Sequence, residues 1–179
     1  GAVVGVEALI RWEHPVWGLL QPGAFIPMAE ETGLIEPIGR WVLIKACRQG
    51  RQWQSKCANP PVVSVNISAC QFQEPGLVDL VSFVLGATGL DPQLLKLEIT
   101  ESAVMADAAR AVETLKQLKE LGVGLAIDDF GTGYSSLNYL RRFQVDALKI
   151  DRTFIAGLGN DAGDRAIVEA VVGLAHTLG

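Results

Sequence analysis

Five short apolar segments constrain the fold of this chain more than any other feature of its sequence. They cover residues 3–11, 62–67, 94–100, 123–128 and 147–150. Each is dense in aliphatic or β-branched residues, as expected of strands buried within a sheet. Apolar side chains recur at helical spacing in the segments 76–87, 107–121, 135–143 and 164–178. Strands that alternate with helices predict a parallel sheet, because parallel neighbours need a long crossover connection.

One unusual polar side chain stands in or at the end of each predicted strand. These residues are Glu7, Asn66, Glu98, Asp128 and Lys149. An isolated buried carboxylate would cost more free energy than a domain's net stability of about 5–15 kcal/mol, so such groups must be paired or bound to a ligand. Either a doubly wound sheet or a (β/α)8 barrel would satisfy the alternation. Functional residues that converge from successive strand ends are typical of a barrel's C-terminal mouth, which favours the barrel.

The same polar residues form a set of oxygen donors. Asp129 adds a carboxylate directly after Asp128. Carboxylate and amide oxygens suit magnesium, manganese or calcium, whereas zinc favours the His and Cys ligands that this set lacks. Adjacent carboxylates repel each other unless cations lie between them, and two metal ions about 3.5–4 Å apart recur in phosphodiester cleavage. Lys149 would then orient a water molecule, and Asp151 would point the same way along its strand.

Taken singly, each of these residues has an ordinary structural explanation. Glu98 and Glu101 are, by residue type alone, more often exposed or helix-capping than metal-bound. Asp128 and Asp129, which precede a Phe-Gly pair, are typical of a turn or a helix cap. A lone lysine such as Lys149 usually lies at the surface. The functional hypothesis therefore depends on the occurrence of all these residues at successive strand ends.

Composition excludes several classes of protein. A formal net charge of -5 argues against a basic face that binds polymeric nucleic acid. The apolar stretch around Glu169 and Gly173 is interrupted and falls short of the roughly 20 residues that a membrane span needs, so this segment is not expected to contact a membrane. Three cysteines without metal-ligand spacing fit a reducing cytoplasm. His14, which precedes Pro15, is interpreted as a loop residue that binds backbone instead of metal.

Several longer strings are specific enough to indicate a family. Glu7, Ala8 and Leu9 lie within VEALIRWEHP, and the other strings are FIPMAEETGLI, IGRWVL, VNIS, LEITES, DDFGTGYSSLNYL and LKIDRTFI. Together they resemble the EAL family of cyclic di-GMP phosphodiesterases, whose signature is the tripeptide Glu-Ala-Leu. The resemblance spans essentially the whole chain. It implies an α/β fold, a TIM-like (β/α)8 barrel of the EAL type, with residues 1–179 forming a partial EAL phosphodiesterase domain.

The resemblance also implies ligand roles. One divalent cation would be bound by residues from four strands, namely Glu7, Asn66, Glu98 and Asp128. Asp128 and Asp129 would serve a second cation, so the expected cofactor is two Mg²⁺ or Mn²⁺ ions. Arg11, on the same face of its strand as Glu7, would meet a phosphate of the substrate, and Leu9 would contact the substrate too.

Three further residues are expected to take part in catalysis. Lys149 would contact the water that attacks phosphorus, with Asp151 beside it as a catalytic residue. Glu101 would hold the DDFGTG loop in place, and the glycines of that loop suit a gate over the site. The implied reaction is the hydrolysis of one phosphodiester of cyclic di-GMP to linear pGpG in bacterial second-messenger signalling. The alternatives are a noncatalytic cyclic di-GMP receptor and a regulatory interaction module.

The family pattern is longer than this chain. It begins about one strand and one helix before Gly1, and it continues after Gly179 into a strand that bears a further glutamate. We therefore expect about five of the eight strands here, and weak or no activity of residues 1–179 alone. The resemblance also implies sensory or cyclase domains linked in the same polypeptide, and it allows a homodimer. The expected location is cytoplasmic, with or without a membrane anchor elsewhere in the parent protein.

Overall fold

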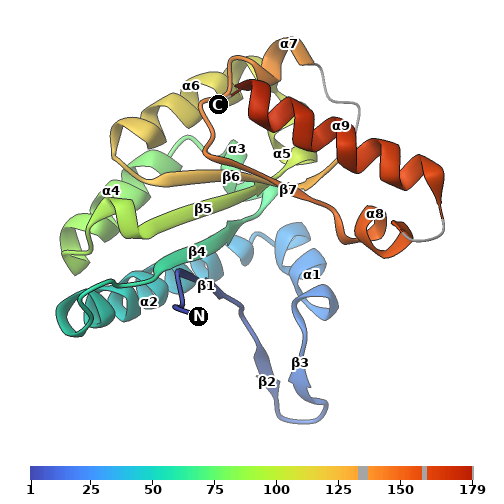
Figure 1. The fold of residues 1–179 in the computed structure, drawn as a ribbon. Coiled ribbons are helices and arrows are strands. Elements are labelled where there is room, and N and C mark those ends of the chain that lie inside the picture. Colours follow the sequence, from blue (N-terminus) through green and yellow to red (C-terminus); the bar gives the residue numbers. More distant parts are fainter. Residues whose placement is uncertain (133–136, 159–160, 179) are drawn as a thin grey trace.

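The chain folds around one sheet of five parallel strands (Figure 1). Its structure, a computed structural model, describes residues 1–132, 137–158 and 161–178. The strands, in their order across the sheet, are β1 (Gly5–Ala8), β4 (Val62–Ile67), β5 (Leu95–Thr100), β6 (Gly124–Phe130) and β7 (Ala147–Ile150). Every neighbouring pair is parallel. The predicted parallel sheet is confirmed, and each strand falls within or beside the segment predicted for it.

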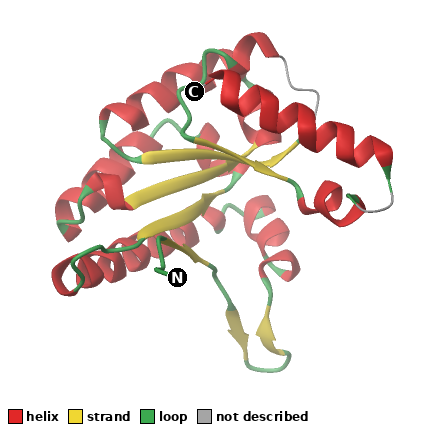
Figure 2. Ribbon diagram, viewed as in Figure 1, coloured by secondary structure: helices red, strands yellow, loops and turns green. Residues whose placement is uncertain are grey.

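Helices connect the strands and pack mainly against the sheet and each other (Figure 2). The described helices are α1 (Ile26–Glu31), α2 (Ile35–Lys56), α3 (Ala69–Gln73), α4 (Leu77–Thr88), α5 (Glu101–Ala106), α6 (Ala108–Glu120), α7 (Leu137–Leu140), α8 (Arg152–Gly157) and α9 (Ala162–Leu178), with short 3-10 turns η1 (Pro22–Ala24) and η2 (Pro92–Leu94). The segments predicted as helices correspond to α4, α6, α7 and α9. Part of the segment 135–143 lies outside the described residues. None of the described helices has the combined length and apolarity that a bilayer-spanning helix requires.

The strand register gives the sheet one apolar and one functional face. Val65 pairs with Leu97 and Ile99 with Ile127, and all four side chains are buried in the core. Successive side chains of a strand point to opposite faces. The residues between these apolar positions therefore share the other face, where Asn66 pairs with Glu98. All five polar residues that the sequence analysis selected from the strands lie on that face: Glu7, Asn66, Glu98, Asp128 and Lys149.

The first strand is shorter than the sequence predicts. Among the strands that the structure describes, β1 pairs only with β4, and the pairing ends at Ala8. Without a partner beyond Ala8, the chain leaves the sheet and forms an antiparallel hairpin of β2 (Trp12–His14) and β3 (Gly18–Leu20), which projects from the body of the molecule (Figure 1). The expectation that Arg11 continues the strand of Glu7 is therefore wrong. Arg11 lies between β1 and β2.

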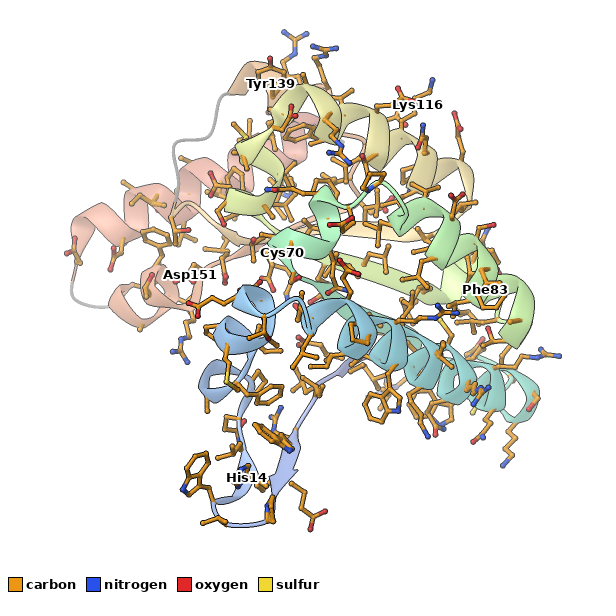
Figure 3. The ribbon with its side chains drawn as sticks, turned by 180° about the vertical axis from the view of Figure 1, so that it is seen from behind. His14, Cys70, Phe83, Lys116, Tyr139 and Asp151 are labelled. Carbon is orange, nitrogen blue, oxygen red and sulfur yellow. The ribbon has the colours of Figure 1, made fainter. Side chains whose placement is uncertain are left out.

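His14 stabilises the turn of this hairpin. Its Nδ1 accepts hydrogen bonds from the backbone N–H groups of Val16 at 3.1 Å and Trp17 at 3.2 Å. The Trp17 ring stacks on the imidazole with 4.3 Å between centroids, although the residue is 71% exposed. The prediction that His14 binds backbone is confirmed, but its predicted place in a loop is wrong, because it is the last residue of β2. Figure 3 shows His14 on the projecting hairpin, away from Asp151.

A tight helix contact fixes the chain just after β4. Ser68 accepts a hydrogen bond from Gln71 N, and Gln71 Oε1 accepts one from Ser68 N, each at 3.3 Å, which forms a capping box at the start of α3. A Cβ at Gly39 of α2 would lie 1.8 Å from Gln71 Nε2. A larger residue at position 39 would push the Gln71 side chain out of this capping box, so glycine lets α2 and α3 pack closely beside the strand end that carries Asn66.

Candidate active site

Lys149 lies between two carboxylates at the carboxyl ends of the strands. Its Nζ is 2.6 Å from Glu98 Oε2 and 2.8 Å from Asp128 Oδ2. The three residues come from β7, β5 and β6, so the parallel sheet brings together groups that are 21 and 51 residues apart in sequence. Glu98 is only 5% exposed. A carboxylate buried to that extent needs a charged partner, and Lys149 provides it.

The environment of Lys149 stabilises its charged form. Burial alone would lower the pKa of this lysine, but hydrogen bonds to Asp128 and Glu98 outweigh burial and raise the pKa above its ordinary value. The ammonium therefore keeps its proton at neutral pH. In this geometry Lys149 is a cation held by two acids, and it does not act as a base.

Glu7 and Asn66 form a second polar pair on the same face. Asn66 Nδ2 donates a hydrogen bond of 2.7 Å to Glu7 Oε1. Both side chains are exposed, in contrast to Glu98. Asn66 is also the register partner of Glu98, so the two pairs occupy adjacent strands. The structure thus brings together four of the residues predicted as ligands, in two hydrogen-bonded groups.

Asp129 and Asp151 lie at the rim beyond these pairs. Asp129 has φ 53°, a left-handed conformation that is uncommon outside glycine, although Asp tolerates it better than most residues. Burial raises the pKa of Asp129 above its ordinary value, and the nearby carboxylates of Asp128 and Asp151 raise it further. A hydrogen bond from the Thr153 hydroxyl lowers the pKa of Asp151.

Asp151 also has a structural task. Its Oδ1 accepts a hydrogen bond of 2.7 Å from Thr153 N and thereby caps the N-terminus of α8. An aspartate is among the preferred residues at this position because it satisfies a backbone N–H that the helix leaves free. The cap accounts for Asp151 without catalysis, so its catalytic role stays a prediction.

Glu101 binds the backbone that follows Asp129. Its Oε2 accepts a hydrogen bond of 2.8 Å from Gly131 N, and the residue is only 3% exposed. Gly131 has φ 102°, a conformation that side chains rarely allow. Glu101 therefore fixes the beginning of the loop after β6, in agreement with its predicted role. The predicted gate also includes residues 133–136, which lie outside the described residues.

Of the two residues predicted to bind substrate, Leu9 lines a large cavity and Arg11 does not. Leu9 lines a cavity of about 630 Å³ that also contacts Asn66 and Asp129. Arg11 instead lines a separate hollow with Trp41, and its Nη1 donates to Ile10 O at 2.7 Å. The structure therefore does not bring Arg11 to the cavity, and its contact with a phosphate stays a prediction.

The cavity contains residues that the sequence analysis did not select. Its lining includes the hydroxyl groups of Ser68, Thr100 and Ser102, and apolar side chains such as Ile26 and Ile35. The sequence signal that could have identified these hydroxyl residues is their position at the ends of β4 and β5. The apolar lining residues come from α1 and α2, and no local sequence pattern identifies them as part of a binding site. A cavity lined by both apolar and hydroxyl-bearing side chains suits a ligand that is part aromatic and part polar.

The site suits a hard cation in its chemistry. Among the described residues, no three His, Cys, Asp or Glu side chains are gathered as a preformed metal site. However, Glu98 and Asp128 both direct an oxygen at one positively charged atom, the Nζ of Lys149. Two converging carboxylates are the donors that Mg²⁺ and Mn²⁺ prefer. The donor set therefore fits such an ion, and the two-cation cofactor stays a prediction.

The sequence pattern and this geometry agree with one known family. The family model described as the EAL domain matches residues 1–179. The chain belongs to the EAL domain family. Among curated proteins, it is 53% identical over 178 residues to the bifunctional diguanylate cyclase/cyclic di-GMP phosphodiesterase MucR of Pseudomonas aeruginosa. The aligned region covers 99% of this chain and 26% of MucR. It is also 47% identical over 177 residues to an uncharacterized protein of Mycobacterium tuberculosis, which covers 98% of this chain and 28% of that protein.

Solved structures of EAL domains share the fold. The MucR phosphodiesterase in complex with c-di-GMP matches with a TM-score of 0.96 and 53% identity, over 99% of this chain and 72% of that chain. The FimX EAL domain of Pseudomonas aeruginosa, bound to c-di-GMP, matches with a TM-score of 0.84 and 27% identity, over 96% of this chain and 68% of that chain. The predicted fold class, an incomplete barrel of the EAL type with five parallel strands, is confirmed. The chain spans about a quarter of the length of MucR and of the Mycobacterium tuberculosis protein, and 59% of the length of a shorter Mycobacterium bovis relative.

Proposed function

We propose that this chain is part of a cyclic di-GMP phosphodiesterase that hydrolyses one phosphodiester of its substrate to give linear pGpG with the help of Mg²⁺ or Mn²⁺. The observation that carries the proposal is the convergence of Glu98, Asp128 and Lys149. Their neighbours Asn66 and Asp129 line a cavity of about 630 Å³. MucR, which is named as a cyclic di-GMP phosphodiesterase and has been solved with c-di-GMP, supports the choice of substrate.

The carboxylates would hold the cations and Lys149 would hold a proton. Glu98, Asp128 and Asp129, together with Glu7 and Asn66, are the residues that would bind Mg²⁺ or Mn²⁺. When bound, such ions lower the pKa of a coordinated water and neutralise charge on phosphoryl oxygens.

The chain's other residues would position the reacting groups. The ammonium of Lys149 donates hydrogen bonds and would stabilise a negatively charged oxygen at the reacting phosphate. Glu101 keeps the backbone after Asp129 in place through Gly131 N. The apolar side chains of Ile26 and Ile35 would receive a base, while the hydroxyl groups in the lining would meet its polar edge or a ribose.

The relatives also suggest how the activity is used. Because MucR and several other relatives are about four times as long as this chain, we propose that sensory or cyclase domains share its polypeptide. The proposed setting is bacterial second-messenger signalling in the cytoplasm.

The proposal is tested with the full-length protein that contains this chain. Purified protein is incubated with cyclic di-GMP in Mg²⁺, in Mn²⁺ and in EDTA, and pGpG is quantified by chromatography. We expect pGpG only with a divalent cation. The Lys149→Met variant should lose far more kcat than affinity for cyclic di-GMP, because its proposed contact forms during the reaction. A matched control is Lys119→Met, which removes another ion-paired lysine outside the site.

Two results would overturn the proposal in different ways. Tight binding of cyclic di-GMP without pGpG in any cation would identify a noncatalytic receptor. Neither binding nor turnover would identify an interaction module.

A further inference from the structure

Lys149 occupies the place that a cation bound by Glu98 and Asp128 would need. Its Nζ is within 2.8 Å of an oxygen from each carboxylate. A divalent ion held by the same two oxygens would lie beside the ammonium, at a separation where like charges repel strongly. The contacts seen here and cation binding by these same two oxygens are therefore mutually exclusive for one position of the side chain.

We propose that Lys149 is an internal counter-ion for Glu98 and Asp128, and that a divalent cation binds Glu98 Oε2 and Asp128 Oδ2 together only by displacing it. The inference rests on the proposed function in so far as both concern the same cation site. It adds a role for Lys149 before any substrate arrives, in which the lysine sets the cation concentration at which the site fills.

Burial explains why the protein needs such a counter-ion. The Glu98 side chain is 6% exposed and that of Asp128 is 22% exposed, so water solvates neither charge fully. Two nearby carboxylates without a cation would repel each other and destabilise the strand ends of β5 and β6. Lys149 satisfies both with one charge, and its own side chain is 37% exposed. It is therefore accessible enough to leave.

The lysine side chain is suited to displacement. Its four-carbon stem is flexible, and its ammonium makes hydrogen bonds without the fixed planar geometry of arginine. Asp129, on the neighbouring strand, is close enough to interact electrostatically with Lys149. After displacement the ammonium would thus remain near a carboxylate, which keeps the lysine within the site for the later reaction.

Cation affinity in the absence of substrate tests this role directly. Mn²⁺ binding to the full-length protein is measured by calorimetry for the wild type and for the Lys149→Met variant. We expect Mn²⁺ to bind about tenfold more tightly to Lys149→Met, because the ion no longer has to break two charge-assisted hydrogen bonds. Lys149→Arg keeps the positive charge and should bind Mn²⁺ no more tightly than the wild type.

Lys119→Met is a matched control. Lys119 Nζ likewise makes two close contacts, at 2.8 and 3.0 Å, but both are with Asp146, away from the site. Its replacement should leave Mn²⁺ affinity unchanged. A gain in affinity also distinguishes the proposal from a merely structural role, because a loosened site would bind the cation more weakly.

Thermal unfolding supplies a second measurement. In EDTA, Lys149→Met should melt at a lower temperature than the wild type, and Mn²⁺ should raise its melting temperature by more than it raises that of the wild type. For Lys119→Met, the rise caused by Mn²⁺ should equal that of the wild type. Equal or weaker Mn²⁺ affinity of folded Lys149→Met would overturn the inference while leaving the proposed function intact. Tighter Mn²⁺ binding by Lys149→Met, together with no turnover by the wild type, would support the inference and overturn the proposed function.

Discussion

The two halves of the candidate site are built differently. In the half formed by β5, β6 and β7, Lys149 forms ion pairs with two mostly buried carboxylates, Glu98 and Asp128. In the half formed by β1 and β4, a neutral amide binds one exposed carboxylate at 2.7 Å. The first half has three neighbouring strands to position its groups, whereas β1 has only one partner among the described strands.

Because of this difference, we expect one half of the site to be rigid and the other half to adapt to a ligand. Buried charges in low dielectric interact strongly and hold a defined geometry, whereas exposed pairs contribute little because water competes for them. We therefore expect the β5–β7 half to determine chemistry and stability together. The β1–β4 half should adjust when a ligand or cation arrives, and replacing its residues should be tolerated better by the fold.

The largest expected effect follows from replacing Asp128. Asp128→Asn in the full-length protein should lower turnover by about 1000-fold or more, because an amide is a neutral and weaker cation ligand. Glu7→Gln, the matched change in the other half, should lower it by roughly 10- to 100-fold. Rates of pGpG formation at saturating Mg²⁺ measure both effects. Circular dichroism should show both variants folded, and equal losses would abolish the distinction between the halves.

The next effect in size concerns the loop that follows β6 and begins next to Asp129. Glu101→Ala removes the acceptor of Gly131 N and leaves space beneath the loop. We expect turnover to fall by about 10- to 100-fold, because misplacing catalytic groups by about 1 Å has effects of that order. Glu101→Gln keeps an acceptor oxygen of the same size and should retain most of the rate. If both variants behaved alike, the charge of Glu101 and not its hydrogen bond would be the important property.

The sheet was predictable because its signal is local. The strands of Val65 and Leu97 are dense aliphatic runs, and both strands occur where that pattern places them. The period of two in a strand also places Asn66 and Glu98 on the opposite face from those apolar residues. The sequence therefore predicts that these polar residues converge from successive strand ends, and the register of the sheet places them on one face.

The remaining features depend on contacts between distant segments. The apolar run through Arg11 reads as one strand, but its end is set by the extent of pairing with β4, which the run itself does not encode. The ion pairs of Lys149 depend on the register of three strands. No spacing along the chain distinguishes a lysine that contacts water from one that bridges two carboxylates.

A smaller effect is expected on stability in the absence of metal. Glu98→Gln leaves Lys149 with one charged partner instead of two and should destabilise the fold by about 1–2 kcal/mol. That loss corresponds to a melting temperature lower by roughly 2–8 °C for a domain of this size. Glu7→Gln keeps an acceptor for Asn66 and should change stability by less than about 0.5 kcal/mol. Melting curves in EDTA compare the two, and a larger effect of Glu7→Gln would contradict the proposed difference in rigidity.

The smallest effect should come from the support of Asn66 in the adaptable half. Ser68→Ala removes the hydroxyl that accepts from Gln71 N at the start of α3. Loss of such a cap destabilises proteins by about 1 kcal/mol, although Gln71 can still accept from the backbone N–H of residue 68. We expect less than a threefold change in turnover, because Asn66 itself remains on its paired strand. Ser68→Thr preserves the cap and should restore the melting temperature. A loss of turnover as large as that of Asp128→Asn would show that the β1–β4 half requires a fixed geometry after all.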